Sequence, residues 1–276
     1  MIAKPKQVAV TGGFDDLRSG HIRLLHEASR LGDLTVLLWS DETLRRRVGK
    51  PPKFAQAERG YLLQSIRYVR QVRLVEGPVP ESAIPELPGF HPEIWVVDES
   101  EDSAVKRSAC QTRGVQLRVL RPGDLDGFPE DPSGAGLKPA RRKVVVTGCF
   151  DWFHSGHVRF FEEVAGFGDL YVVVGHDANI RLLKGQGHPR FPQEERRYVV
   201  QSVRFVQQAR VSTGNGWLDA EPEIERLRPD IYAVNEDGDQ PVKREYCKAH
   251  GIEYLVLKRT PAPGLPPRRS TDLRGC

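Results

Sequence analysis

Cysteine is scarce in this sequence, and its spacing does not suit a metal site. The 276-residue chain has four cysteines, and none lies in a C-x-x-C pair. They are Cys110, Cys149, Cys247 and Cys276. We therefore expect reduced thiols and no metal cage built from protein ligands alone.

Long apolar runs are missing as well. The hydrophobic runs are only a few residues long, and the N-terminal residues 1–6 lead directly into a predicted strand. A membrane span needs roughly 20 apolar residues, and a signal peptide needs a run of roughly 7–15. We therefore predict neither of them, and we expect a cytoplasmic protein.

The chain also lacks a large excess of charge of one sign. Its 41 basic and 37 acidic residues give a net charge of +4. The densest basic runs, residues 45–47 and 141–143, have no aromatic residues interleaved with them. This pattern is mild for a nucleic-acid-binding protein, so we expect no nucleic-acid partner and a few anion-binding sites instead.

The most informative stretch of the sequence is residues 146–157, which we expect to form a strand end, a tight loop and a helix start. The apolar run at residues 144–146 leads into the loop, and a helical pattern follows His157. Free backbone N–H groups at a helix start favour an anion, most often a phosphate. His154 and His157 add hydrogen-bond donors there, and Gly156 removes a side chain that would keep a phosphate from the backbone.

This stretch occurs twice in the chain. Phe14 falls on Phe150 and His21 on His157 when the two copies are aligned. Further along, residues 64–69 match residues 201–206, and residues 105–107 match residues 242–244. The chain therefore contains an internal duplication.

Each copy alternates short apolar runs with helical patterns. In the second copy we expect strands at residues 143–147, 170–175, 209–212, 231–235 and 254–257, and helices at residues 156–167, 193–207, 221–228 and 241–250. This alternation is typical of a parallel sheet covered on both faces, so we predict an α/β protein with two tandem doubly wound, Rossmann-like domains. The predicted domains are residues 1–121 and 141–276, joined by a Gly-, Pro- and Asp-rich linker at residues 122–140.

The two copies differ in chemistry. Arg18 replaces His154 in the first copy, and the lysine of the Leu-Lys-Gly block at residues 183–185 is displaced to Lys50. The first copy also runs into the linker without the Ser-Thr pair of Ser270 and Thr271. We interpret the first copy as a degenerate, pseudo-catalytic domain.

The second copy resembles the nucleotidylyltransferase superfamily. Residues 154–157 match its H-x-G-H signature, and residues 177–185, 192–196 and 268–273 are similar to successive blocks of the cytidylyltransferase group. They are also similar to the adenylyltransferase domain of ADP-heptose synthase. The tandem arrangement resembles ethanolamine-phosphate cytidylyltransferase, although the eroded copy is the second one there.

The resemblance implies a nucleotidyltransferase reaction. A phosphorylated alcohol or sugar would attack the α-phosphorus of CTP or ATP, and pyrophosphate would leave. His154, His157 and Lys184 would be the catalytic residues, with Lys184 on a mobile Gly-rich loop. Mg²⁺ would enter with the nucleoside triphosphate and bridge the leaving oxygens.

The resemblance also implies a set of nucleotide-binding residues, and it leaves three assignments open. Either Arg259 or Arg268 holds the phosphates, because the proline-rich residues 261–267 interrupt the last block. Arg196 either braces the nucleotide loop or contacts the nucleotide, and the acidic turn that includes Asn235 and Asp237 either borders the ligand or is only a turn. The full set is Thr147, Gly148, Cys149, Phe150, Asp151, Gly156, Asp177, Arg196, Asn235, Asp237, Arg259, Arg268, Ser270 and Thr271.

Three functions compete. Transfer of CMP from CTP to a phosphorylated alcohol comes first, and an ATP-dependent sugar-phosphate adenylyltransferase comes second. The third is a non-catalytic nucleotide-binding regulatory protein, because one copy is already eroded. Members of the family that the second copy resembles often form dimers through their active-site faces. We therefore expect the first copy to pair with the second in an intramolecular pseudo-dimer, and a further homodimer is left open.

Overall fold

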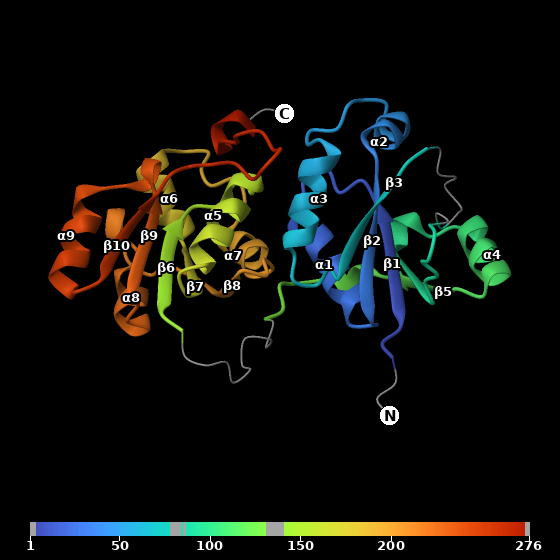
Figure 1. The fold of residues 1–276 in the computed structure, drawn as a ribbon, viewed down its shortest axis with the longest axis horizontal. Helices are drawn as coiled ribbons and strands as arrows, with labels where there is room; N and C mark the ends of the chain where they lie inside the picture. Colours follow the sequence, from blue (N-terminus) through green and yellow to red (C-terminus); the bar gives the residue numbers. More distant parts are fainter. Residues whose placement is uncertain (1–3, 78–83, 85–86, 131–140, 274–276) are drawn as a thin grey trace. The chain divides into compact units, whose positions relative to one another are not determined.

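The chain divides into two compact units. The structure, a computed structural model, describes residues 4–77, 84, 87–130 and 141–273, without the side chains of Thr271 and Asp272. Unit 1 runs from Met1 to Gly127 and unit 2 from Phe128 to Cys276. Figure 1 shows in each unit a twisted sheet with helices packed on it.

Unit 1 alternates strands and helices as the duplication predicts. Its elements are β1 (Gln7–Gly12), α1 (Ser19–Ser29), β2 (Asp33–Trp39), α2 (Asp41–Val48), α3 (Gln56–Ser65), β3 (Gln71–Val75), β4 (Ile94–Asp98), η1 (Glu99–Glu101), α4 (Ala104–Arg113), β5 (Gln116–Leu120) and η2 (Pro122–Leu125). The last of these, the short helix η2, lies in the predicted linker and packs against α1.

Unit 2 repeats this order. Its elements are β6 (Lys143–Gly148), α5 (Ser155–Ala165), β7 (Asp169–Val174), α6 (Asp177–Lys184), α7 (Gln193–Gln201), β8 (Val206–Val211), η3 (Gly216–Leu218), α8 (Glu221–Leu227), β9 (Ile231–Asn235), η4 (Glu236–Gly238), α9 (Pro241–His250), β10 (Glu253–Leu257) and η5 (Ser270–Leu273). The β-branched residues Val144, Val145 and Val146 of β6 are fully buried, because this strand lies in the middle of the sheet with helices on both faces. The apolar stripe along α5 packs on one of these faces.

Both sheets are parallel and five-stranded. Unit 1 has the order β3-β2-β1-β4-β5, and unit 2 has the matching order β10-β9-β6-β7-β8 read from its other edge. Ligands of such sheets bind beyond the carboxyl ends of the strands, where the strand order reverses. In unit 2 this point lies between β6 and β9, and the predicted α/β fold with two tandem Rossmann-like domains is confirmed.

The two cores repeat the same positions. Trp95, Val97 and Cys110 lie in the unit 1 core, where Tyr232, Val234 and Cys247 lie in the unit 2 core. Cys110 and Cys247 are fully buried, which is the small-core role that their context predicts. Duplication of the sequence has therefore preserved the packing of one sheet face.

The helix expected at residues 193–207 is shorter in the structure. It ends at Gln201, and β8 begins at Val206 instead of residue 209. The Ser202 hydroxyl donates to the Val199 carbonyl, and the Val203 N–H donates to the Val200 carbonyl, so the last turn tightens and closes the helix.

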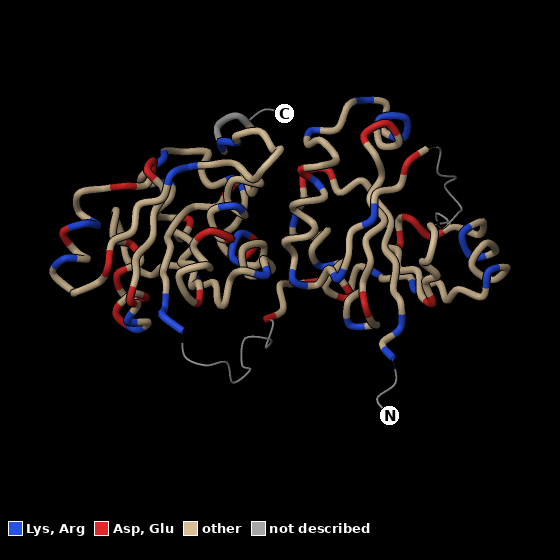
Figure 2. The backbone as a smooth tube through the Cα atoms, viewed as in Figure 1, with Lys and Arg blue, Asp and Glu red and all other residues tan. Residues whose placement is uncertain are grey.

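Charge is spread over both units. Figure 2 shows Lys and Arg interspersed with Asp and Glu along the backbone, which fits the near balance of the composition. Among the residues that the structure describes, no helix is long and apolar enough to cross a membrane.

Candidate active site

His154 closes the start of α5. It occupies the N-cap position, and its Nδ1 accepts a hydrogen bond from the Gly156 N–H at 3.1 Å. A Cβ on Gly156 would lie 2.9 Å from the His154 ring, so the glycine lets the imidazole fold back over the helix start. This steric reason differs from the predicted one, which was access of a phosphate to the backbone.

The two histidines of the motif stack on each other. The ring centroids of His154 and His157 are 3.9 Å apart, with 20° between the ring planes. Burial, followed by the charges of Arg259 and Arg268, lowers the pKa of His154 to about 3. Burial, followed by the neighbouring His154, Arg259 and Lys184, holds the pKa of His157 well below its usual value. Both imidazoles are therefore neutral at pH 7.

Neutrality fixes where the His154 proton lies. Because Nδ1 accepts from Gly156, the proton is on Nε2, which faces the Ser270 hydroxyl at 3.5 Å. His157 has one buried ring nitrogen, Nδ1, without a hydrogen-bond partner in the described part of the chain. The helix start therefore presents the neutral His157 ring to the cleft, whereas the His154 ring is fully buried.

A cleft of about 690 Å³ opens over the carboxyl ends of β6 and β9. It brings together eleven of the predicted site residues: Thr147, Gly148, Cys149, Phe150, Asp151, His157, Lys184, Asn235, Asp237, Arg259 and Ser270. Its lining also includes Trp152, Phe160, His188, Val234, Glu236, Gly238, Lys243 and Arg269. The cleft lies at the switch point of the sheet, where the topology places a ligand.

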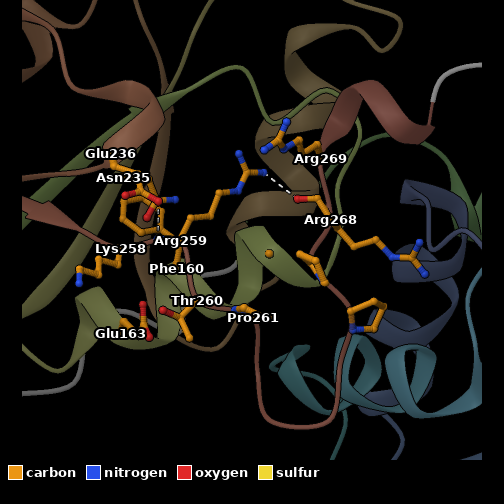
Figure 3. A pocket seen from close by; sticks show the side chains of 13 residues that line it. Phe160, Glu163, Asn235, Glu236, Lys258, Arg259, Thr260, Pro261, Arg268 and Arg269 are labelled. Carbon is orange, nitrogen blue, oxygen red and sulfur yellow. Dashed lines mark hydrogen bonds between the residues drawn. The ribbon is translucent and has the colours of Figure 1, made fainter.

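A smaller cavity of about 150 Å³ adjoins the cleft and shares five lining residues with it, Phe160, Asn235, Glu236, Arg259 and Arg269. Figure 3 shows Phe160 and Glu163 of α5, Glu236 of η4 and the segment after β10 around this cavity. Gly156 and Arg268 line it as well. The linings of the two cavities do not include His154, Asp177 or Arg196.

The two candidate phosphate arginines differ in the structure. The Arg259 guanidinium lines both cavities, forms an ion pair with Asp237 and donates to the Arg268 carbonyl at 2.7 Å. Figure 3 shows the Arg268 side chain directed away from Arg259. Thr271 belongs to η5, but its side chain lies outside the described residues.

Arg196 is a buried brace. It is 1% exposed and donates to the carbonyls of Phe191 and Gly175 and to the Asp177 carboxylate, at 2.8–2.9 Å. It also donates to the Cys149 carbonyl at 2.5 Å. Its guanidinium therefore ties together the loops that follow β6 and β7 and the start of α7.

Asp151 holds the loop in front of α7. One carboxylate oxygen accepts from the N–H groups of Arg190 and Phe191, at 2.8 and 3.0 Å. The other oxygen is buried without a hydrogen-bond partner, 3.8 Å from His188 Nδ1. Asp151 thus positions this loop and also lines the cleft.

Phe150 has strained backbone geometry. Its φ of 51° lies in the left-handed region, which costs a bulky residue about 1–3 kcal/mol. The ring packs 5.2 Å from Phe161 and 5.3 Å from His157, and a Cβ on Gly148 would lie 2.8 Å from it. The glycine therefore admits a ring that supports His157.

Lys184 is a helix residue, which corrects the expectation of a mobile loop. It is the last residue of α6, whose start is capped by His176 accepting from the Asn179 N–H. Gly185 then ends the helix with a φ of 85°, so the glycine terminates the helix and the lysine precedes the turn. Lys184 is exposed and lines the cleft.

Thr147 and Cys149 lie at the carboxyl end of β6. The Thr147 hydroxyl is 2.7 Å from the Tyr232 hydroxyl, and burial of that phenol raises its pKa. Burial also raises the pKa of the Cys149 thiol, so it remains protonated and is not a nucleophile.

Residues 9–109 and 145–273 match the family described as cytidylyltransferase-like. The chain belongs to the cytidylyltransferase-like family. The predicted enzyme class, nucleotidyltransferase, is confirmed by this membership.

Several relatives are similar to parts of the chain. The FAD synthase of Ferroglobus placidus is 37% identical over 120 residues, which is 42% of this chain and 75% of the relative. The FAD synthase of Thermococcus kodakarensis is 33% identical over 125 residues, covering 44% and 81%. The bifunctional protein HldE of Alcanivorax borkumensis is 35% identical over 162 residues, which is 55% of this chain and 31% of HldE. The chain thus spans about a third of that longer relative.

Unit 1 retains the family fold but not the same site groups. Arg18 stands where His154 does and forms an ion pair with Asp16 at 2.5 Å. Val48 is the last residue of α2, at the place that Lys184 has in α6. Asp15 and Arg59 keep the bracing contacts of Asp151 and Arg196, with Arg59 fully buried. The first copy has thus kept the brace while two of its site positions carry other residues.

Sequence reasoning missed two cations that line the cleft. Arg269 adjoins the predicted Arg268, and Lys243 lies in a pair of matching segments to which no role was assigned. A comparison of the two copies at the residues around Lys243 is the signal that could have found it.

Proposed function

We propose that unit 2 transfers AMP from ATP to a phosphorylated acceptor. A phosphate oxygen of the acceptor forms a new bond to the α-phosphorus, the bond between this phosphorus and the α–β bridging oxygen breaks, and pyrophosphate leaves with the electron pair. No covalent enzyme intermediate is required, so the protein acts by positioning and by stabilising charge.

The observation that carries the proposal is the stacked pair of neutral histidines at the start of α5, beside Arg259. The helix start offers backbone N–H groups and the positive end of a dipole to the phosphates. The His157 ring lies in the cleft itself. The proton on His154 Nε2 would reach a phosphate oxygen at the place where the Ser270 hydroxyl now lies, 3.5 Å away.

Among the arginines, we assign Arg259 to the leaving phosphates. Its guanidinium lines both cavities, and Arg268 contributes a carbonyl that orients it. Lys184, at the end of α6 on the cleft wall, would contact the α-phosphate and the incoming acceptor. Arg196 and Asp177, which are hydrogen-bonded to each other, hold the loops around these residues and line neither cavity.

Magnesium would enter with the triphosphate. The described residues hold no group of three or more His, Cys, Asp or Glu side chains that could bind a metal by itself. The phosphate oxygens would supply most of the ligands of the ion, and Asp151 would be the neighbouring carboxylate. When bound, Mg²⁺ neutralises charge on the leaving oxygens.

The names of the relatives support ATP as the donor. FAD is an adenine dinucleotide, and FAD synthase is the name of two of the relatives given above. CTP, the donor expected from the cytidylyltransferase resemblance, remains the second candidate, since the family takes its description from that activity. The predicted pseudo-dimer of the two units stays a prediction.

The test is pyrophosphate release by the purified chain. ATP and CTP are each offered with a panel of phosphorylated alcohols, sugars and flavins, with a His157→Ala variant as control. Turnover with ATP and one acceptor class, lost in the variant, supports the proposal. Tight nucleotide binding without turnover for any pair would instead favour a non-catalytic nucleotide-binding protein.

A further inference from the structure

A buried lysine faces the cleft of unit 2. Lys243, near the start of α9, is 7% exposed and lines the cleft beside Gly238. Its ammonium lies 3.5 Å from the Gly238 carbonyl and 5.7 Å from the centre of the Tyr232 ring. Among the described residues, it forms no ion pair with a carboxylate.

In unit 1, the matching lysine is paired with a carboxylate. Lys106 is 5% exposed, and its ammonium forms an ion pair with the Glu101 carboxylate. It also donates to the Glu101 carbonyl at 2.7 Å. Glu101 ends η1 as Gly238 ends η4, so the two copies share the fold here and differ by one carboxylate.

The nearest acidic groups do not replace that partner. Asp219 accepts from the Ser212 hydroxyl at 2.7 Å. Asp239 is paired with Arg244 and accepts from the Tyr254 hydroxyl at 3.1 Å. Burying an ammonium without a partner is costly, so a position of this kind favours an anionic ligand.

Lys243 reaches the cleft from the face of the sheet opposite to the histidines. Tyr232 and Cys247 pack in the core cluster beneath α8 and α9. Figure 1 shows α9 and α5 on opposite sides of the sheet of unit 2. In-line transfer needs the attacking group and the leaving pyrophosphate on opposite sides of the α-phosphorus. A cation across the cleft from His157 is therefore placed on the acceptor side.

We propose that Lys243 binds the phosphate of the acceptor substrate, and that glycine at position 238, where unit 1 has Glu101, leaves it available to do so. This inference rests on the proposed function and makes Lys243 a specificity-determining residue for a phosphate monoester. Burial, the largest influence, lowers the pKa of Lys243, whereas Asp219, Cys247 and Asp239 act to raise it. A phosphate bound beside the ammonium would raise it as well.

The decisive variant restores the missing carboxylate. A Cβ at Gly238 would meet only the Val234 Cβ at 3.9 Å, and Gly238 is not among the glycines with a positive φ, so Gly238→Glu is sterically accommodated. Its carboxylate would form an ion pair with Lys243, as that of Glu101 does with Lys106. Lys243→Met removes the charge with similar length, and Lys106→Met is the matched control in unit 1.

The experiment measures KM for the acceptor and for the nucleotide separately. We expect Gly238→Glu and Lys243→Met to raise the acceptor KM at least about tenfold, as expected for the loss of a charge-assisted hydrogen bond, and to leave the nucleotide KM within about twofold. Lys106→Met should change neither constant. Unchanged acceptor KM in both unit 2 variants, or a rise in the nucleotide KM instead, would overturn the assignment.

A second measurement separates this proposal from the proposed function. Calorimetry of inorganic phosphate binding to the full chain, in the presence of a non-hydrolysable nucleotide, needs no turnover. Binding by the wild type and Lys106→Met that is lost in Gly238→Glu supports an acceptor phosphate site even if no acceptor pair reacts. Equal binding by all variants, or no binding by the wild type, contradicts it.

Discussion

At the scale of single residues, His157 is the side chain whose loss should affect the reaction most directly. Its ring lies in the cleft, stacked on His154. Removing one preorganised donor to a developing charge costs about 10²–10³ in kcat. We expect His157→Ala to lower kcat by this factor while nucleotide affinity falls much less, and a variant with unchanged kcat would refute its catalytic role.

His154 should make stability depend on pH. Its pKa is about 3 in the folded chain against 6.5 for the unfolded chain, so between these values only the unfolded state binds the proton. Stability contributed by neutral His154 is present above pH 6.5 and falls by about 1.4 kcal/mol per pH unit as pH decreases. Denaturant unfolding between about pH 6 and 4 should show a slope at least this large, because His157, whose pKa is also held low, adds to it.

The control for that slope is His154→Asn, which keeps an N-cap acceptor but does not titrate in this range. Its unfolding free energy should vary less with pH than that of the wild type, by the contribution of one histidine. Identical slopes for both proteins would mean that His154 is not buried in the neutral form.

Arg259 and Arg268 offer a matched pair of neighbouring cations. The Arg259 guanidinium lines the cleft, whereas Arg268 contributes its carbonyl to Arg259. Arg259→Met should raise the nucleotide KM and lower kcat/KM by about ten- to a hundredfold, the value of a charge-assisted hydrogen bond. Arg268→Met should have a much smaller effect, and the reverse order would assign the phosphates to Arg268.

At the scale of elements, the brace around Arg196 joins the loops after β6 and β7 to the start of α7. Removing the guanidinium leaves the carbonyls of Cys149, Gly175 and Phe191 without their donor, and losses of about 1–3 kcal/mol for each buried acceptor give about 3–5 kcal/mol in total. We expect Arg196→Met to lower the free energy of unfolding of unit 2 by about this amount, measured by urea denaturation. Arg197→Met is the control, because Arg197 pairs with the half-exposed Glu194 and should change stability by less than about 1 kcal/mol.

Unit 1 contains the counterpart of this brace, built around Arg59. Arg59 makes the same contacts and is fully buried. Arg59→Met should destabilise unit 1 to a similar extent, which limited proteolysis can assign to residues 4–77. Loss of stability in unit 2 alone from both variants would contradict two equivalent braces.

At the scale of the whole molecule, nucleotide binding should protect one unit. A ligand at 100 times its Kd adds about 2.7 kcal/mol to the stability of the unit that binds it. We expect ATP with Mg²⁺ to slow amide exchange in the loops after β6, β9 and β10, and to leave the loops after β1 and β4 unchanged. Equal protection of both units would show that the first copy still binds a nucleotide.

Much of this protein follows from local sequence pattern. The alternation of apolar strands and helical stretches, written twice, predicts two parallel sheets, because residues that bury one face of a strand or helix recur at a fixed period. The spacing of His154, Gly156 and His157 likewise predicts an anion site at a helix start, since these residues are adjacent in the chain.

Tertiary structure decided what lies between distant segments. That Arg196 braces loops while Arg259 lines the cleft depends on side chains that meet across β6, β7 and β10, and no local period encodes such meetings. The same holds for the neutral state of His154, which comes from burial and from arginines more than 100 positions away in the chain. Lys243 shows both contributions. Its burial is visible only in the fold. The lack of a carboxylate partner could be predicted from the sequence, because Gly238 aligns with Glu101, the partner of Lys106 in unit 1.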